Sequence, residues 1–450
     1  MANVRTYPGS LHNHTQYSNA RLRDCIIKET DLLSYAVELG HEVVAITDHE
    51  SIMNAVKVEK AYKKIKEKNP DFKVIFGNEI YLCRNGLNNE NFIAGQDKYY
   101  HFILLAKDAI GHQQIREIST RAWMRSYMAR GMRRVPTYYQ DLIDVIGADR
   151  GHVIGCTACL GGALATQLLR YKETKSEALY GKIQQWCDQM EWIFGVDNFF
   201  LELQPSESHE QTYVNRMLID LANNFHFRYI ITTDSHYLRK EDKTIHKAYL
   251  NAQDGDREVD AFYATTYMMD TAELESHMDL TEAELEEAYS NIRRIAAMCK
   301  DYSLLKPLKI PELKWKTYSI SQKAANDYFE LIPMLKTFME SPHSADKELV
   351  YAVIAGINSH PDLQNQRAYD EINMNLEMTW VSSNVNNARW SAYYLNLQKI
   401  IDTCWEAGSI VGPGRGSGVG FILLYVLGIT QINPLRETTK CFAWRLTLRV

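Results

Sequence analysis

The stretch that decides the fold is Leu11-His12-Asn13-His14-Thr15-Gln16-Tyr17-Ser18, close to the start of the chain. In extended backbone alternate side chains point to the same face, so His12 and His14 can converge on one object. A metal ion is one candidate for that object, and a polar edge strand without a ligand is the alternative. The motif alone does not separate the two, so the ends of the later strands must decide.

Length and composition indicate a globular protein of roughly two to three domains. The chain has 450 residues, of which 46% are hydrophobic, and its formal net charge of −6 gives no overall basic signature. Contact with nucleic acid would therefore come from local patches. No apolar run approaches the ~20 residues that span a bilayer, and the N-terminus lacks an apolar signal core, which predicts a cytoplasmic protein with no membrane partner. The eight cysteines are scattered and are expected to be reduced.

Short β-rich runs alternate with helical stretches over residues 1–240. Such alternation with short connections is typical of parallel strands in a barrel or a doubly wound sheet, and we expect a barrel. One amphipathic helix is expected over 51–68, with Ser51 as its N-cap. The runs that predict buried strands are 43–47, 73–80, 101–106, 152–156, 199–203 and 229–233.

Polar residues that can bind a metal lie at or near the ends of three of these runs. Thr47-Asp48-His49 ends one strand, Gly77-Asn78-Glu79 lies late in another, and residues 232–236 end a third with Asp234 and His236. In (β/α) barrels the side chains at the carboxyl ends of the strands collect at one mouth. Imidazole and carboxylate suit zinc, manganese or iron, and so many donors indicate more than one ion. The sequence therefore predicts a multi-metal site.

The order of these motifs resembles the PHP (polymerase and histidinol phosphatase) domain. The resemblance adds His101, which opens a strand, and Cys159 in Ala-Cys-Leu-Gly. It implies a distorted (β/α)7 barrel with a trinuclear metal centre that hydrolyses phosphoesters. Glu79 would bridge ions, and Asp48 would either orient an imidazole, which we prefer, or assist proton transfer. The ligands that the resemblance implies are His12, His14, Asp24, His49, Glu79, His101, Cys159, Asp234 and His236.

A glycine-rich stretch near the end of the chain, Val411-Gly-Pro-Gly-Arg-Gly-Ser-Gly-Val-Gly420, is the second informative motif. Glycines let backbone amides approach an anion, and Arg415 adds a planar charged group, an arrangement that suits a triphosphate. An ordinary turn is the alternative. The Walker A lysine is absent, which argues against a P-loop NTPase.

Together with residues 393–395, 399–402 and 427–435, this stretch resembles the start of the palm in C-family DNA polymerases, the bacterial DNA polymerase III alpha type. A PHP domain precedes the palm in that family, as the order of motifs does here. The residues that would hold the phosphates of the incoming deoxynucleotide are Gly414, Arg415, Gly416 and Ser417.

The two resemblances divide the chain into three segments. The first is a PHP metal-dependent phosphoesterase barrel over 1–270, and the second is a helical and extended connector over 271–316, with two prolines near its end. The third is a mostly helical, incomplete palm and thumb region over 317–450. A domain boundary is expected near 300–315.

The resemblances imply the N-terminal part of a DNA-directed DNA polymerase whose PHP centre acts as a 3′–5′ exonuclease. Its partners would be DNA primer-template, deoxynucleotide triphosphates, and a missing C-terminal polymerase half or other replisome proteins. Polymerase chemistry needs carboxylates that hold Mg²⁺, and the last aspartate here is Asp402. The chain alone is therefore expected not to extend primers, whether it is a fragment, half of a split polymerase or a frame-disrupted product.

Two other interpretations stay open at this point. One is a free-standing PHP phosphatase that hydrolyses a small phosphate monoester, which the glycine-rich stretch argues against. The other is a scaffold that docks replication proteins without catalysis, which the intact ligand set argues against. A stretch of interleaved arginines and aromatics over 121–134 suits either single-stranded DNA or a solvated helix and loop.

Overall fold

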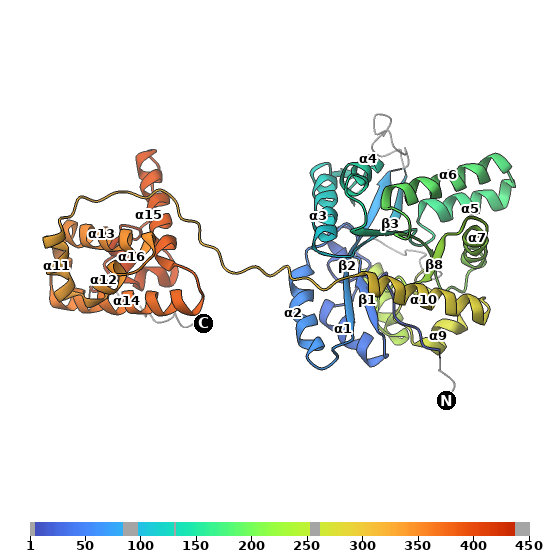
Figure 1. Ribbon diagram of the computed structural model, residues 1–450, viewed down its shortest axis with the longest axis horizontal. Coiled ribbons are helices and arrows are strands. Elements are labelled where there is room, and N and C mark those ends of the chain that lie inside the picture. The colour runs from blue at the N-terminus through green and yellow to red at the C-terminus, as the bar shows by residue number, and fades with distance from the viewer. Residues whose placement is uncertain (1–4, 84–97, 130–131, 253–261, 437–450) are drawn as a thin grey trace. The chain divides into compact units, whose positions relative to one another are not determined.

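The computed structural model describes residues 5–83, 98–129, 132–252 and 262–436. The chain divides into two compact units, Met1–Leu305 and Lys306–Val450, which Figure 1 draws with their elements labelled. The division falls in the stretch where the sequence predicts a boundary. Residues 271–298, which the sequence assigns to a connector, instead contribute helices α9 (Thr271–Ser276) and α10 (Glu282–Met298) to the first unit.

A curled sheet of six strands forms the centre of the first unit, so the predicted α/β class is confirmed (Figure 1). The strand order is β1-β2-β3-β6-β7-β8, and β3 runs antiparallel to both of its neighbours. The expectation of parallel strands throughout is therefore wrong at β3, because antiparallel neighbours such as β2 and β3 need no crossover helix between them. The strands are β1 (Val43–Ile46), β2 (Lys73–Cys83), β3 (Tyr99–Ala106), β6 (Val153–Cys156), β7 (Phe199–Leu203) and β8 (Arg228–Ile231).

Residues 8–14 close the curled sheet by lying between β1 and β8. On one side the backbone N–H of Val43 donates to the carbonyl of Pro8 at 3.0 Å. On the other side the N–H of His14 donates to the carbonyl of Ser235 at 2.9 Å. This segment therefore takes the place of a seventh strand, and backbone hydrogen bonds fix the position of the His-x-His motif.

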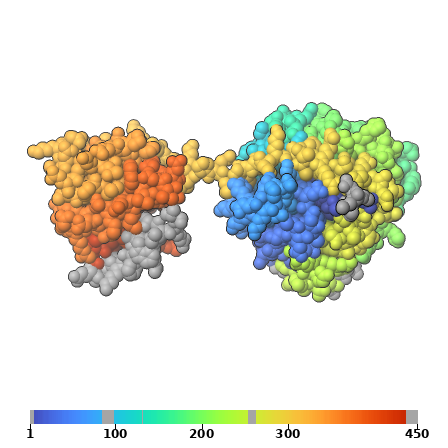
Figure 2. Space-filling model, turned by 60° about the horizontal axis from the view of Figure 1, so that its bottom comes forward, coloured from blue at the N-terminus to red at the C-terminus, as the bar shows by residue number. Residues whose placement is uncertain are grey.

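Helices pack around the sheet, and α10 lies against β8. Figure 2 shows the blue segments around α1 and α2 beside the yellow segments of α9 and α10 on one face of this unit. The helix expected over 51–68 is α2, which begins after Asn54, so Ser51 is not its cap. The remaining elements of the unit are α1 (Glu29–Glu38), α2 (Ala55–Lys66), α3 (Ala109–Met124), the hairpin β4 (Tyr127–Ala129) and β5 (Met132–Arg134), α4 (Tyr139–Leu142), α5 (Ala163–Thr174), α6 (Glu177–Phe194), α7 (His209–Phe225) and α8 (Lys243–Asn251).

The second unit is built from helices in its described residues. Residues 299–321, which include the division between the units, carry neither helix nor strand. Its core surrounds α13, which packs against α12, α15 and α16. Among the described helices of the chain, none has the length and apolar character that a bilayer crossing requires. The helices are α11 (Gln322–Leu331), α12 (Pro333–Met339), α13 (Ser344–Ser359), α14 (Gln366–Val385), α15 (Trp390–Glu406) and α16 (Ile422–Val426).

Gly356 allows α13 and α16 to approach closely. A Cβ atom at Gly356 would lie 2.1 Å from the carbonyl oxygen of Val426, which is backbone and cannot rotate away. We expect Gly356→Ala to destabilise the second unit by about 3 kcal/mol, at the upper end of the usual cost of overpacking. Denaturant unfolding of the full chain, followed by circular dichroism, measures this change.

Gly181→Ala is the matched control for that substitution. Gly181 lies inside α6, and a Cβ atom there would have nothing within 4 Å. The control should raise stability by about 0.5–1 kcal/mol through helix propensity alone. Equal effects of the two substitutions would contradict the close approach of α13 and α16.

Candidate metal centre

The nine predicted ligands come together at one end of the curled sheet. Segment 8–14 brings two of them between β1 and β8, and His49 follows β1. Glu79 lies on β2 beyond the last residue that pairs with β1, and it forms an isolated bridge with His49. Asp234 and His236 follow β8. The overhang of β2 therefore sets the Glu79 carboxylate level with the loops at the carboxyl ends of the parallel strands.

His101 joins this group because β3 is reversed. The first residues of an antiparallel strand lie beside the last residues of its neighbours, and His101 pairs with Tyr81 near the end of β2. Cys159 follows β6 in a turn where Ala158 has a φ of 60°, and its Sγ lies 3.5 Å from His101 Nδ1. The expectation that ligands lie at the carboxyl ends of parallel strands does not predict His101, and only the family resemblance did so.

The donor atoms form three groups, two of which share His14, and within each group all atoms lie within 4.8 Å of one another. In the first group the Nε2 atoms of His12 and His14 and Asp234 Oδ1 are separated by 3.0–3.1 Å. The second group is His14, His49 and His236, and the third is Glu79, His101 and Cys159. Asp24 lies beside the second group, with Oδ2 3.1 Å from His49 Nε2 and 3.6 Å from His236 Nε2.

Glu79 lies among four of the histidines. Its Oε2 is 2.7 Å from His49 Nδ1 and 3.1 Å from His14 Nε2, and its Oε1 contacts His101 Nδ1. Within the described part of the chain, neither oxygen has a hydrogen-bond partner of acceptable geometry, and the same holds for Asp24 Oδ1 and Asp234 Oδ1. Buried carboxylate oxygens are costly in that condition unless a cation compensates them. The donor set therefore fits divalent metal ions.

Charge coupling in this cluster ties metal binding to protons. Burial lowers the pKa of His49, but the nearby carboxylates of Asp24 and Glu79 outweigh it and raise the pKa to about 9. Burial opposes ionisation of Asp234 and Glu79 as well, yet the surrounding imidazoles hold the pKa of both carboxyls below the usual range. A cation that binds here must displace protons from imidazoles.

Glu202 on β7 contacts the predicted ligand His12, and the sequence did not predict this contact. Its buried Oε1 accepts hydrogen bonds from His12 Nδ1 at 2.6 Å, from Thr232 Oγ1 at 2.5 Å and from Gln204 Nε2 at 3.0 Å. This contact turns His12 Nε2 toward the other ligands and fixes the tautomer. A glutamate inside the apolar run Phe199–Leu203 was the available signal, because buried carboxylates need a partner.

Asp48 lies behind the ligands rather than among them. Its carboxylate accepts hydrogen bonds from Thr15, Ser18 and Asn54, and Ser18 Oγ lies 3.0 Å from His14 Nδ1. Among the described residues no ligand nitrogen lies within ion-pair distance of Asp48. These contacts fit the orienting role, which acts on His14 through Ser18, and they do not supply a path for direct proton transfer.

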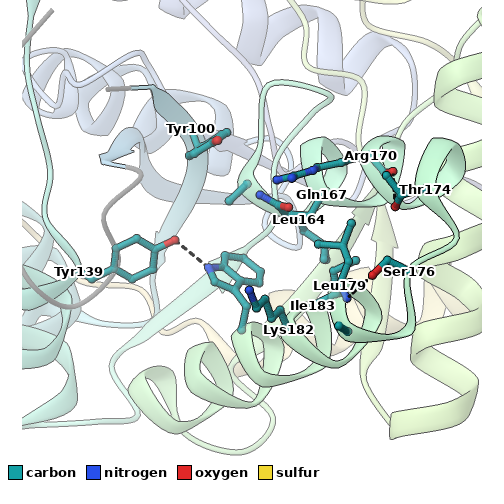
Figure 3. A pocket seen from close by; sticks show the side chains of 13 residues that line it. Tyr100, Tyr139, Leu164, Gln167, Arg170, Thr174, Ser176, Leu179, Lys182 and Ile183 are labelled. Atoms are coloured by element: carbon teal, nitrogen blue, oxygen red, sulfur yellow. Dashed lines mark hydrogen bonds between the residues drawn. The ribbon is translucent and has the colours of Figure 1, made fainter. Parts of the chain in front are cut away.

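A cavity of about 490 Å³ between α5 and α6 is separate from this centre (Figure 3). Tyr100 lines it from β3, and side chains alternate along a strand, so Tyr100 and His101 point to opposite faces. Trp186 Nε1 donates a hydrogen bond to the Tyr139 hydroxyl at its edge, at 2.7 Å. None of the nine predicted ligands lines this cavity.

The glycine-rich stretch lies in the second unit, where residues 414–417 are exposed. Gly414 has a φ of +136°, and a Cβ atom there would lie 2.4 Å from the Val419 side chain, so the turn requires glycine. Beside it is a cavity of about 650 Å³ whose lining includes Arg415, Trp390 and Tyr394. The role of residues 414–417 as a phosphate loop stays a prediction.

Two family models match the chain. Residues 10–206 match the PHP domain, and residues 349–444 match the bacterial DNA polymerase III alpha NTPase domain. The chain carries a PHP domain followed by DNA polymerase III alpha sequence. Seven of the nine predicted ligands lie inside the matched PHP range, and the other two, Asp234 and His236, follow β8 in the same unit.

Two DNA polymerases are similar to this chain along nearly its whole length. The DNA-directed DNA polymerase of Bacillus phage SPbeta is 36% identical over 453 residues, covering 94% of this chain and 34% of that protein. The DNA polymerase III subunit alpha of Aquifex aeolicus is 28% identical over 441 residues, covering 95% of this chain and 34% of that protein. A solved metal-dependent phosphoesterase from Bifidobacterium adolescentis aligns with 65% of this chain and 96% of its own at 14% identity, with a TM-score of 0.34. The chain spans about a third of the length of the two polymerase relatives.

Removal of the charge at Glu202 should weaken metal binding by the PHP domain. We expect Glu202→Gln to lower the affinity about 10- to 100-fold, because His12 loses the carboxylate that orients it. Competition with a chromophoric chelator measures the affinity, and circular dichroism checks folding. Glu207→Gln removes the same charge from an exposed position nearby, and it should leave the affinity unchanged. A normal affinity in Glu202→Gln would contradict the orienting role.

The raised pKa of His49 predicts opposite pH trends for stability and metal affinity. Without metal, its folded pKa of about 9 exceeds the ordinary value of 6.5, so its contribution to stability is complete below pH 6.5 and is lost as the pH rises through 9. We expect the Tm of chelator-treated protein to fall over this window. Zinc affinity should rise by up to about tenfold per pH unit for each displaced proton. His49→Gln should reduce both slopes, and unchanged slopes in that variant would contradict the assignment.

Proposed function

We propose that the PHP domain is a metal-dependent phosphoesterase that removes nucleotides from the 3′ end of DNA, within a chain that works as part of a C-family DNA polymerase. The observation that carries the proposal is the convergence of nine buried or half-buried residues with metal-binding atoms, among which both oxygens of Glu79 and one oxygen each of Asp24 and Asp234 lack a hydrogen-bond partner in the described residues. Phosphoester hydrolysis is the chemistry that such a donor set suits. The DNA polymerase relatives favour DNA as the substrate.

Divalent ions held by these donors would supply a water of lowered pKa and would offset negative charge on the phosphate. Hydrogen bonds from residues outside the ligand set orient two of the histidines. Glu202 bonds to His12, and Ser18, which donates to Asp48, bonds to His14. Eight of the nine ligand residues are buried, which excludes bulk water, whereas the His101 side chain is 22% exposed. A phosphate group would therefore enter on the His101 side. The three donor groups are consistent with a trinuclear centre of zinc, manganese or iron.

The exposed glycine-rich stretch supports a second part of the proposal. We infer that Gly414, Arg415, Gly416 and Ser417 contact the phosphates of an incoming deoxynucleotide, with Mg²⁺ as the ion of the complete polymerase. The family match over residues 349–444 includes this stretch. Arg415 is exposed and has no ion-pair partner within the described ranges, so its guanidinium is free to meet an anion.

An assay on metal-quantified protein tests the exonuclease. We expect release of nucleotides from a labelled, mismatched 3′ end in the presence of Mn²⁺ or Zn²⁺, and a loss of about 100-fold or more in His12→Ala, because the first donor group is broken. His209→Ala, at an exposed position on α7, is the control and should keep full activity. Release of phosphate from small monoesters without DNA degradation would instead identify a small-molecule phosphatase. If fully metallated protein is inactive on both substrates, the remaining interpretation is a scaffold that docks replication proteins without catalysis.

A further inference from the structure

Arg21 is a buried arginine beside the metal centre. In the described part of the chain no carboxylate lies within ion-pair distance of it, although the buried carboxyl of Glu50 interacts with its charge from further away. The residue is 5% exposed, and its Nε is buried with no hydrogen-bond partner there. Its guanidinium lies over the ring of Tyr81, with Cζ 4.4 Å from the ring centroid. Nη1 donates to the sulfur of Met132 at 2.9 Å, a weak acceptor.

Two other arginines of the same unit show what Arg21 lacks. Arg125 forms a two-point ion pair with Asp141, at 2.7 and 2.5 Å, and Arg121 pairs with Glu117 at 2.6 Å. A guanidinium stays charged at any physiological pH, so its burial without a carboxylate in direct ion-pair contact is costly. The face of the Tyr81 ring recovers only part of that cost. An anion that binds next to Arg21 would recover the rest.

Tyr81 connects Arg21 to the metal ligands. Its hydroxyl lies 3.2 Å from His49 Nδ1, and its ring meets the His101 ring edge-on with centroids 4.6 Å apart. His101 is the half-buried ligand, on the side where a phosphate would enter. Arg21 therefore lies one aromatic ring away from two ligands, one of which is the half-buried His101.

We propose that Arg21 binds the phosphate group that the metal centre hydrolyses, and this rests on the phosphoesterase function proposed above. The free Nε and the neighbouring Nη of a guanidinium form a planar fork that matches two phosphate oxygens. Arg21 would hold the phosphate against the ligand side of the site and would add a positive charge that no metal ligand supplies. It is a binding residue for the substrate phosphate, whatever the leaving group.

The test compares Arg21→Gln with Arg23→Gln in the full chain with quantified metal. Arg23 is exposed two residues further on, so its substitution removes the same charge without touching the site. Two readouts are used: hydrolysis of bis(p-nitrophenyl) phosphate, a diester with one phosphate, and calorimetric titration with inorganic phosphate. We expect Arg21→Gln to lower kcat/KM and to weaken phosphate binding, each about 10- to 100-fold. Arg23→Gln should change neither.

Arg21→Lys keeps the charge but not the fork, and it should restore only part of the phosphate affinity. It also decides the question if Arg21→Gln loses metal or unfolds, because full phosphate affinity in metal-loaded Arg21→Lys would overturn the proposal. Unchanged phosphate affinity in Arg21→Gln would overturn it too, as would an effect on DNA alone with the one-phosphate diester unaffected. Phosphate binding that depends on Arg21 in a chain that hydrolyses no ester would support the anion site and refute the phosphoesterase.

Discussion

The metal centre depends on backbone hydrogen bonds that hold residues 8–14 between β1 and β8. Burying a cluster of imidazoles and carboxylates costs solvation free energy, and the cluster would relax toward water if the segments that carry it could move. The segment cannot move freely, because its N–H and carbonyl groups are paired to strands and loops on both sides. These hydrogen bonds fix the positions of His12 and His14. Their side chains share a face, and the Nε2 atom of each lies about 3 Å from Asp234 Oδ1.

A reversed strand completes the centre from the opposite side. Since β3 runs against its neighbours, His101 near its start reaches the same end of the sheet as Glu79 on β2 and Cys159 after β6. The ligands therefore lie on or next to strands of both directions, and no long loop is needed to bring His101 to the others. The alternation of side chains along β3 turns Tyr100 to the other face, toward the cavity between α5 and α6, and so separates that cavity from the metal ligands.

Sequence patterns predicted the strands and the nine candidate ligands because both are local properties. Each buried strand is a short apolar run, and each ligand belongs to a short motif or to a family resemblance. The direction of β3 and the role of Glu202 could not be predicted, since they depend on pairing between distant segments: His12 and Glu202 are 190 positions apart. The start of α2 was wrong for a related reason. The Ser51 carbonyl accepts a hydrogen bond from Asn78, and the Asn54 side chain donates to Asp48, so this loop supports the site instead of starting the helix.

Charge balance connects the proposed number of ions to the proposed substrate. The carboxylate ligands are Asp24, Glu79 and Asp234, and burial raises the pKa of the Cys159 thiol, which favours its neutral form until a metal binds. One divalent ion would leave these three carboxylates in excess, and the site would repel a phosphate. Counted over the ligands alone, three divalent ions would reverse the sign even with a thiolate present. The carboxylates of Glu202 and Asp48 behind the ligands would offset that excess, and Arg21 would add positive charge to the same field. A trinuclear centre and a buried arginine without an ion-pair partner in the described residues would therefore have the same effect. Both would attract an anion to a site whose own ligands are anionic.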